Sequence, residues 1–263
     1  MRNDHIDLSG RTALVTGASR GIGEAAVRRL YAAGANVVLA ARTLENTDAI
    51  ASELGARALA VECDVADYDA VERAVARTAT RFGSLDILVN NAGLMDPIAR
   101  IENADPAGWG KVVDVNLKGA FHAIRAALPR MKANDPSLPG AKRGVIVNIS
   151  SGAATSALEG WSHYSSTKAA LLMLTRCVHK EEAENGIACV GLSPGTVATD
   201  MQRTIRDSGI NPVSRLDWSK HIPPEWVGEA IAWLTTEPAR AHDGADFSLK
   251  NDAGRDAVGL PRE

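Results

Sequence analysis

The segment Thr12-Ala-Leu-Val-Thr-Gly-Ala-Ser-Arg-Gly-Ile-Gly23 joins an apolar run to a helical pattern through three glycines. The apolar run has no polar alternation, which is typical of a strand buried on both faces of a sheet. Glycines between a strand and a helix let the backbone approach a pyrophosphate, and the helix N-terminus offers free N–H groups. The alternative is a tight turn that uses glycine for its geometry alone, because the spacing differs from the commonest dinucleotide fingerprint. The position after the first strand favours a dinucleotide site.

Apolar runs and helical patterns alternate along the rest of the chain. The predicted strands are 11–16, 36–41, 56–63, 85–89, 144–149 and 187–192, and the predicted helices lie near 22–33, 45–54, 67–82, 106–133 and 161–185. This alternation predicts an α/β fold, a doubly wound parallel sheet of the Rossmann type with helices on both faces. The irregular stretch 133–143 indicates a surface loop. The stretch 208–224, which contains three prolines, indicates a flap. We expect one domain over residues 1–263, because the alternating pattern resumes after each stretch.

Composition excludes several classes of function. The 263 residues carry a net charge of −3 and 4% aromatic side chains, so we expect no nucleic-acid partner and no membrane surface. The three cysteines, Cys63, Cys177 and Cys189, show no Cys-x-x-Cys spacing, which predicts no metal site and a reducing compartment. The polar N-terminus, Met1 to Asp7, does not resemble a secretory signal. These features together predict a cytoplasmic protein.

Two arginines bear on which dinucleotide is bound. An NAD site usually places an acid at the end of the second strand, but this chain has Arg42 there and no acid before Glu45. The glycine turn adds Arg20. Two guanidinium groups suit a 2′-phosphate, which favours NADP(H) over NAD(H). The alternative is that both are ordinary surface arginines.

Tyr164 is the only one of the three tyrosines with a lysine four residues later, Lys168. Helical spacing stacks the phenol and the ammonium on one face, and a nearby cation is expected to lower the pKa of the phenol toward a range useful for proton transfer. Thirteen residues earlier, Ser151 follows the strand 144–149, and open α/β sheets bind their ligands at such strand ends. Any helix can carry a Tyr–Lys pair, but the combination with Ser151 indicates an active site.

Seven motifs occur in order along residues 8–201, and jointly they resemble the short-chain dehydrogenase/reductase family. They are Thr16–Gly23, Cys63-Asp64-Val65, Asn90–Gly93, Val115-Asn116, Asn148–Ser151, Tyr164–Lys168 and Pro194–Met201. The resemblance implies about seven strands, a homodimer or homotetramer, and NAD(P)-dependent redox chemistry at a small carbonyl or alcohol substrate. The segment Ser193–Arg206 is further similar to sepiapterin and benzil reductases, which hints at a carbonyl reductase.

The resemblance also implies roles for individual residues. Tyr164 is the expected general acid, Ser151 hydrogen-bonds the same carbonyl oxygen, Lys168 contacts the nicotinamide ribose, and Asn116 holds a water. Asp64 and Val65 are expected at the adenine, Asn91 at a ribose, and Val197 and Thr199 at the carboxamide and diphosphate. With the turn, the expected cofactor-binding set is Gly17, Ser19, Arg20, Gly21, Ile22, Gly23, Arg42, Asp64, Val65, Asn91, Tyr164, Lys168, Pro194, Gly195, Val197 and Thr199.

Several questions stay open at this point. A non-catalytic dinucleotide sensor, and an epimerase or dehydratase on the same scaffold, are the alternative functions. The C-terminal segment Gly244–Gly254 departs from the Val-Asp-Gly-Gly pattern of many relatives, so no oligomer contact or pocket wall can be copied from them. Substrate selectivity is expected in 94–100, 153–162 and 201–221, where no charged pair identifies the substrate. Residues 199–222 are either a flap that orders over the ligands or a permanently docked loop.

Overall fold

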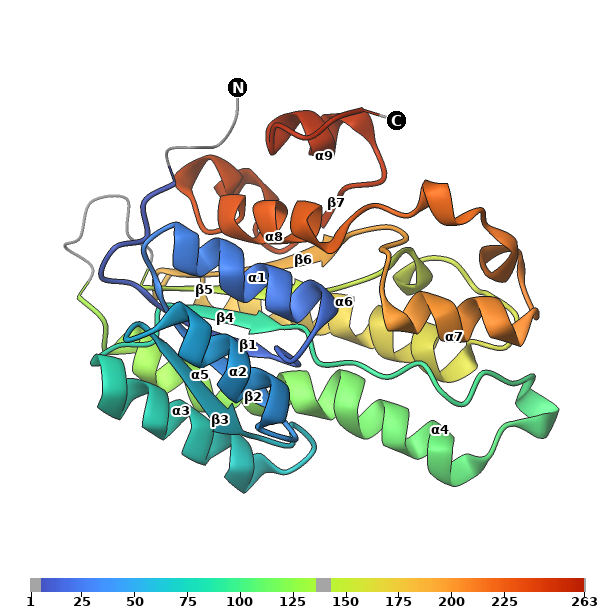
Figure 1. Ribbon diagram of the computed structural model, residues 1–263, viewed down its shortest axis with the longest axis horizontal. Helices are drawn as coiled ribbons and strands as arrows, with labels where there is room; N and C mark the ends of the chain where they lie inside the picture. The colour runs from blue at the N-terminus through green and yellow to red at the C-terminus, as the bar shows by residue number, and fades with distance from the viewer. Residues whose placement is uncertain (1–5, 136–142, 263) are drawn as a thin grey trace.

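A computed structural model describes residues 6–135 and 143–262 of the chain. Most of the N-terminal segment and most of the predicted loop 133–143 therefore lie outside the described residues. Within them, seven parallel strands form one sheet in the order β3-β2-β1-β4-β5-β6-β7 (Figure 1). The strands are β1 Thr12–Thr16, β2 Asn36–Ala41, β3 Ala58–Glu62, β4 Ile87–Asn90, β5 Gly144–Ile149, β6 Ile187–Ser193 and β7 Asp246–Ser248.

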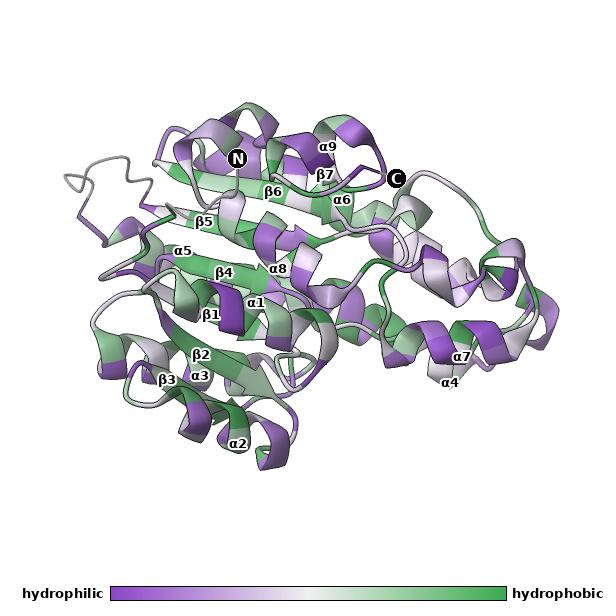
Figure 2. Ribbon diagram, turned by 45° about the horizontal axis from the view of Figure 1, so that its top comes forward, coloured by the Kyte–Doolittle hydropathy of each residue, from purple (hydrophilic) through white to green (hydrophobic). Residues whose placement is uncertain are grey.

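The predicted doubly wound sheet is confirmed, and its two faces have separate cores. Along β1, Ala13 and Val15 point into one core, while Leu14 points into the other, as the alternation of a strand requires. Helices α1 Gly21–Ala32, α2 Glu45–Leu54 and α8 Pro224–Trp233 cover the first face, and α3 Tyr68–Phe82, α5 Gly119–Lys132 and α6 Ser162–Glu182 cover the second. Figure 2 accordingly shows the strands mainly in green, while the helices alternate between green and purple.

The predicted helix near 106–133 differs from the structure in its middle. It begins as α4, Pro106–Val113, passes through a π-helical turn at Asp114–Lys118, and continues as α5. A π turn inserts one residue into the hydrogen-bond ladder, which rotates the side chains that follow it. The turn carries Asn116, so the irregularity falls on a predicted site residue.

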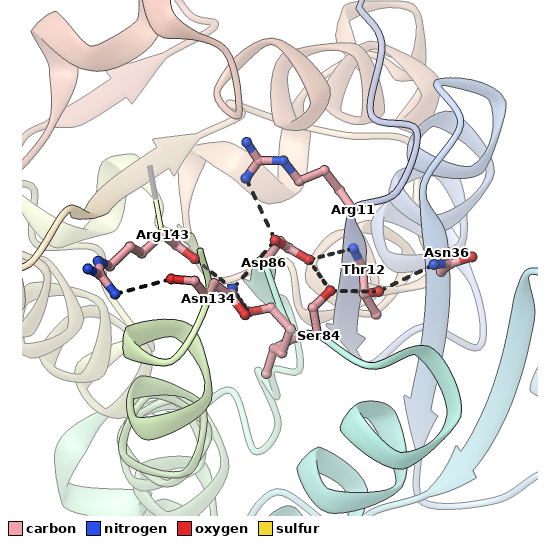
Figure 3. A network of polar contacts seen from close by, with 8 residues as sticks. Arg11, Thr12, Asn36, Ser84, Asp86, Asn134 and Arg143 are labelled. Atoms are coloured by element: carbon pink, nitrogen blue, oxygen red, sulfur yellow. Dashed lines mark hydrogen bonds and ion pairs between the residues drawn. The ribbon is translucent and has the colours of Figure 1, made fainter. Parts of the chain in front are cut away.

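The buried carboxylate of Asp86 joins the amino-terminal ends of the central strands (Figure 3). Asp86 Oδ2 accepts hydrogen bonds from Thr12 N at 2.9 Å and from Ser84 Oγ at 2.6 Å. Its Oδ1 lies 3.7 Å from an Arg11 guanidinium nitrogen and 3.4 Å from Asn134 Nδ2. Charge-assisted bonds of this kind hold the starts of β1 and β4 in register with the end of α5.

The segment after β6 folds back over the opposite edge of the sheet. It contains α7, Asp200–Ser208, and two short 3₁₀ turns, Pro212–Arg215 and Trp218–Lys220, before a parallel bridge between Val197 and Ile222. The sequence predicts only a weak helix at 201–206, whereas α7 has its own buried side chain, Ile205. α9, Asp252–Ala257, follows β7. Among the described residues, no helix is both long and apolar enough to cross a lipid bilayer.

Candidate active site

One cavity of about 1110 Å³ opens at the carboxyl ends of the strands. This is the edge at which open α/β sheets bind ligands, and the volume suffices for a dinucleotide beside a small molecule. The cavity is lined by these predicted site residues: Gly17, Ser19, Arg20, Gly21, Ile22, Arg42, Asp64, Val65, Asn91, Ser151, Tyr164, Lys168, Pro194, Gly195, Val197 and Thr199. Two predicted residues, Gly23 and Asn116, do not line it.

The glycine turn between β1 and α1 has the geometry of a phosphate cradle. Gly17 has φ +64°, and a Cβ there would lie 2.8 Å from Ala92 Cα. A Cβ on Gly23 would lie 2.2 Å from the Gly17 carbonyl oxygen. Gly23 therefore packs against the backbone of Gly17 within the turn and does not line the cavity. No side chain caps the N-terminus of α1, which leaves its first N–H groups for an anion. The turn therefore fits the diphosphate of a dinucleotide.

Asn91 locks this turn onto the end of β4. Its Nδ2 donates to the carbonyl oxygens of Thr16 and Gly17, both at 3.0 Å. Thr16 Oγ1 in turn donates to Val89 O at 3.3 Å and accepts from Asn91 N at 3.1 Å. Sheet order reverses between β1 and β4, so these bonds shape the crevice at the switch point.

Charged side chains gather where the adenosine half of a dinucleotide would lie. Arg42 is exposed at the end of β2, and no described residue forms an ion pair with it. Arg20 lies 3.4 Å from Asp200, and both side chains are largely exposed. Asp64 Oδ1 accepts a hydrogen bond from Ala66 N at 3.0 Å, which leaves carboxylate lone pairs for a donor in the cavity.

Ser151, Tyr164 and Lys168 meet at the other end of the cavity. Tyr164 and Ser151 both line the cavity, where Ser151 is close enough to lower the pKa of the phenol, and Lys168 Nζ lies 5.4 Å from the centre of the phenol ring. The ammonium donates to Ile149 O at 2.7 Å. Two hydroxyls thus face one point in the cavity, with a buried cation beneath them.

Burial dominates the protonation of this pair. Removal from water raises the pKa of Tyr164, and the hydrogen bond from Ser151 only partly offsets this rise. Burial also lowers the pKa of Lys168 to about 8, against the opposing field of Asp246. The expected fall in the pKa of Tyr164 is therefore wrong, because desolvation of the phenolate outweighs the opposing effect of Ser151.

Asn116 is buried behind Lys168 and lines a smaller adjoining cavity with it. Its Nδ2 donates to Leu94 O at 2.9 Å and to Thr167 Oγ1 at 3.3 Å, and its Oδ1 accepts from Leu94 N at 2.7 Å. Both side-chain protons are used, so Asn116 could hold a water only by accepting a hydrogen bond at Oδ1 or at its backbone carbonyl oxygen.

Asp246 on β7 is a feature of the site that the sequence analysis missed. Its Oδ2 accepts from Ser193 Oγ at 2.7 Å and from Ser150 Oγ at 3.3 Å. The two serines directly precede Pro194 and Ser151, so one carboxylate ties together two cavity-lining strand ends. Burial raises the pKa of Asp246, while these two hydrogen bonds and Lys168 oppose the rise. The partners are 53 and 96 residues away in the chain, and no local pattern marks such a contact.

The chain is similar to proteins of known family over nearly its whole length. Residues 11–209 match the family model described as short chain dehydrogenase. A 3-oxoacyl-[acyl-carrier-protein] reductase of Synechocystis sp. is 35% identical, covering 92% of this chain and 96% of the relative. A cis-4-hydroxycyclohexanecarboxylate dehydrogenase of Sinomonas cyclohexanicum is 36% identical, covering 94% and 97%. The crystal structure of a dehydrogenase/reductase from Sinorhizobium meliloti has a TM-score of 0.80, with 32% identity, covering 94% of this chain and 96% of that chain.

The pKa of Lys168 predicts a pH-dependent stability difference. Between about pH 8 and 10.5 the unfolded chain holds a proton on this lysine that the native protein releases. The contribution of Lys168 to the free energy of unfolding therefore rises with pH in this range, by up to ~3 kcal/mol. Lys168→Met lacks this dependence, so its free energy of unfolding relative to wild type is highest near pH 7 and falls between pH 8 and 10.5.

Urea unfolding at several pH values measures this difference. The lost bond to Ile149 O adds an offset that does not depend on pH, so the slope is the test. Lys180→Met, at an exposed lysine on the same helix, is the control and should follow wild type. A constant gap between Lys168→Met and wild type would contradict the depressed pKa.

Proposed function

Since the chain belongs to the short-chain dehydrogenase family, and is thus an NAD(P)-dependent oxidoreductase, we propose that it reduces a small carbonyl substrate reversibly with NADP(H). The observation that carries the proposal is that the hydroxyl-bearing residues Ser151 and Tyr164 line one cavity together with buried Lys168. Two of the relatives described above are named for acting on an oxo group and on a hydroxy group, which supports a carbonyl or secondary alcohol substrate.

In this proposal Tyr164 is the general acid for reduction and the general base for oxidation. Burial raises the pKa of its phenol, so the proton is present at neutral pH and available for the carbonyl oxygen. Ser151 donates a second hydrogen bond to that oxygen and stabilises the negative charge that develops there. Its Oγ also accepts from Ala153 N at 3.2 Å, which orients the hydroxyl.

Lys168 stabilises the phenolate that remains after proton transfer. Its ammonium is charged below about pH 8 and lies against the phenol ring. The bond to Ile149 O holds its position. In this proposal the proton is returned through a water at Asn116. Because both amide protons of Asn116 are already donated, this water would donate a hydrogen bond to an oxygen of Asn116.

The nicotinamide cofactor supplies or accepts the hydride when it is bound. The residues that would hold it are the predicted set, with the glycine turn at the diphosphate, Asp64 and Val65 at the adenine, and the 194–199 loop at the nicotinamide. Arg42 and Arg20 would hold a 2′-phosphate, and the exposed guanidinium of Arg42 at the end of β2 supports NADP(H).

The proposal includes a homodimer or homotetramer in the cytoplasm. Phe121 on α5 and Met173 on α6 are 47% and 54% exposed, and apolar side chains of this size on helix surfaces support self-association. The three free cysteines support a reducing compartment.

We further propose that the chain works as one domain in which residues 199–222 form a flap over the ligands. Met201, Ile205, Val213 and Leu216 from this segment line the cavity. Few side-chain hydrogen bonds join the segment to the rest of the protein, such as the one from Asn211 Nδ2 to Glu159 O at 3.0 Å. Opening would expose the buried side chains of Ile205, Asn211 and Ser214, and closure over bound ligands would bury them again.

The first prediction from the proposed function concerns the proton donor. Tyr164→Phe removes the phenolic proton without creating a cavity, so we expect turnover to fall ~10²–10⁴-fold while NADPH affinity changes little. Steady-state NADPH oxidation and fluorescence titration measure the two effects. Tyr68→Phe, at a half-buried tyrosine on α3 that does not line the cavity, should keep wild-type activity. Retention of more than a tenth of the activity in Tyr164→Phe would refute the assignment, and tight NADPH binding without turnover in wild type would favour the sensor.

The second prediction concerns the cofactor. Arg42→Asp should lower the ratio of kcat/KM for NADPH to that for NADH by ~10–100-fold, because a carboxylate repels the 2′-phosphate and accepts a bond from a free ribose hydroxyl. The double variant with Arg20→Ala should extend the change. Arg77→Asp makes the same charge change on α3, away from the cavity, and should keep the wild-type ratio. An unchanged ratio in Arg42→Asp would rule out the proposed preference.

The third prediction concerns the flap. Amide hydrogen exchange of residues 199–222 should slow by ~10-fold or more when NADPH is added, since Thr199 at the root of the segment lines the cavity. Exchange in the middle of α3, which is remote from the cavity, provides the internal reference. Equal protection with and without NADPH would mean that the segment is a permanently docked loop.

A further inference from the structure

More basic than acidic side chains line the cavity. Its acidic residues among the described ones are Asp64 and Asp200. Asp200 lies beside Arg20, and Asp64 lies at the opposite end from the proposed chemistry. Around Ser151 and Tyr164, the cavity wall therefore offers cations without compensating carboxylates.

Apart from Lys168, Lys250 is the cavity-lining cation whose ammonium lies beside the residue that follows Ser151. Its stem runs along the Pro194–Gly195 loop, where a Cβ on Gly195 would lie 3.1 Å from Lys250 Cγ. Its ammonium reaches the residue after Ser151, since a Cβ on Gly152 would lie 3.6 Å from Lys250 Nζ. Because Gly195 and Gly152 have no side chains, Lys250 can lie close to the backbone at both positions. No described residue forms an ion pair with Lys250, and its ammonium borders the cavity.

The other cations at this end are placed differently. Arg255 is buried, donates to Leu249 O at 2.8 Å, and packs over the Trp226 ring. Lys220 is exposed on the flap at the cavity mouth. Lys250 is exposed as well, but its ammonium lies beside Gly152, the residue after Ser151, and no described residue forms an ion pair with it.

An apolar cluster lies on the other side of Tyr164. Met95, Trp161, Tyr164 and Ile205 form a small core of their own, against which Leu158 packs. All five side chains also line the cavity. This wall suits an apolar group and offers no charge to an anionic one.

We propose that the substrate is an anionic carbonyl compound, an oxo acid or the corresponding hydroxy acid, whose carboxylate pairs with Lys250 while its apolar group lies against the Met95–Trp161–Ile205 wall. The inference rests on the proposed function, because it places the carbonyl oxygen between Ser151 and Tyr164. Lys250 is a specificity residue here: it touches the substrate but takes no part in proton transfer.

A matched pair of probes tests the charge alone. 3-Benzoylpropionate carries an aryl ketone and a carboxylate, and its methyl ester has the same ketone without the charge. With oxidised NADP⁺ present the ketone cannot be reduced, so calorimetry reports binding independently of turnover. We expect wild type to bind the acid ~10-fold more tightly than the ester, as one charge-assisted contact allows, and Lys250→Met to remove this difference.

Steady-state kinetics with NADPH provide a second, independent test of the contact between Lys250 and the carboxylate. The ratio of kcat/KM for the acid to that for the ester should fall ~10-fold in Lys250→Met and further in Lys250→Glu, where like charges repel the acid. The ester should be reduced by Lys250→Met at close to the wild-type rate, which shows that the variant is folded and active. Lys180→Met removes an exposed lysine distant from the cavity and should leave the ratio unchanged.

The outcomes separate the two proposals. Equal handling of acid and ester by wild type and Lys250→Met, with turnover of both, overturns the inference and leaves the oxidoreductase intact. A weaker affinity of Lys250→Met for NADPH with an unchanged acid-to-ester ratio assigns Lys250 to the cofactor instead, and also overturns it. Binding of the acid without turnover of any carbonyl compound in a broad panel supports the anion contact but contradicts the proposed function.

Discussion

The parallel alignment of the seven strands is the constraint on which the site depends. Because every strand points the same way, all carboxyl ends reach one edge, and residues far apart in the chain meet there. The bonds from Asn91 to Thr16 and Gly17 pin the central crevice between β1 and β4, where the connections diverge to opposite faces. At the other edge, Asp86 joins the starts of the same two strands. The two central strands, β1 and β4, are thus held at both ends. The cavity lies at their carboxyl ends.

The site is built at an electrostatic cost. Lys168 is buried with one carbonyl partner, and its pKa of about 8 shows how strongly the protein interior disfavours the ammonium. Asp246 opposes this effect and is itself held by two serines at strand ends. Buried charges of this kind reduce stability unless they are paired, and they persist where a shifted pKa serves the chemistry. The same burial keeps the Tyr164 phenol protonated, so one environment sets both members of the pair.

The cavity divides into regions of different chemistry. Backbone N–H groups and arginines lie along the part that suits a dinucleotide, whereas the far end combines the apolar Met95–Trp161–Ile205 wall with the ammonium of Lys250. The C-terminal segment supplies that ammonium, and this is the segment in which the sequence departs from many relatives. The substrate specificity that we propose therefore depends on a segment whose sequence differs from that of many relatives.

Local sequence patterns predicted the α/β class, six of the strands and the glycine turn, and the resemblance to the short-chain dehydrogenase family added most of the residues that line the cavity. Buried parallel strands lack polar alternation, and motifs such as Tyr164–Lys168 depend on helical spacing, so both can be recognised within a few residues. Only the tertiary structure showed the π turn at Asn116, the rise in the pKa of Tyr164, the contacts of Asp246 and the position of Lys250. Desolvation depends on everything that surrounds a group, and Asp246 meets Ser150 across 96 residues of chain. The sequence identifies which chemical groups are present, and burial and long-range contacts decide their charge and their partners.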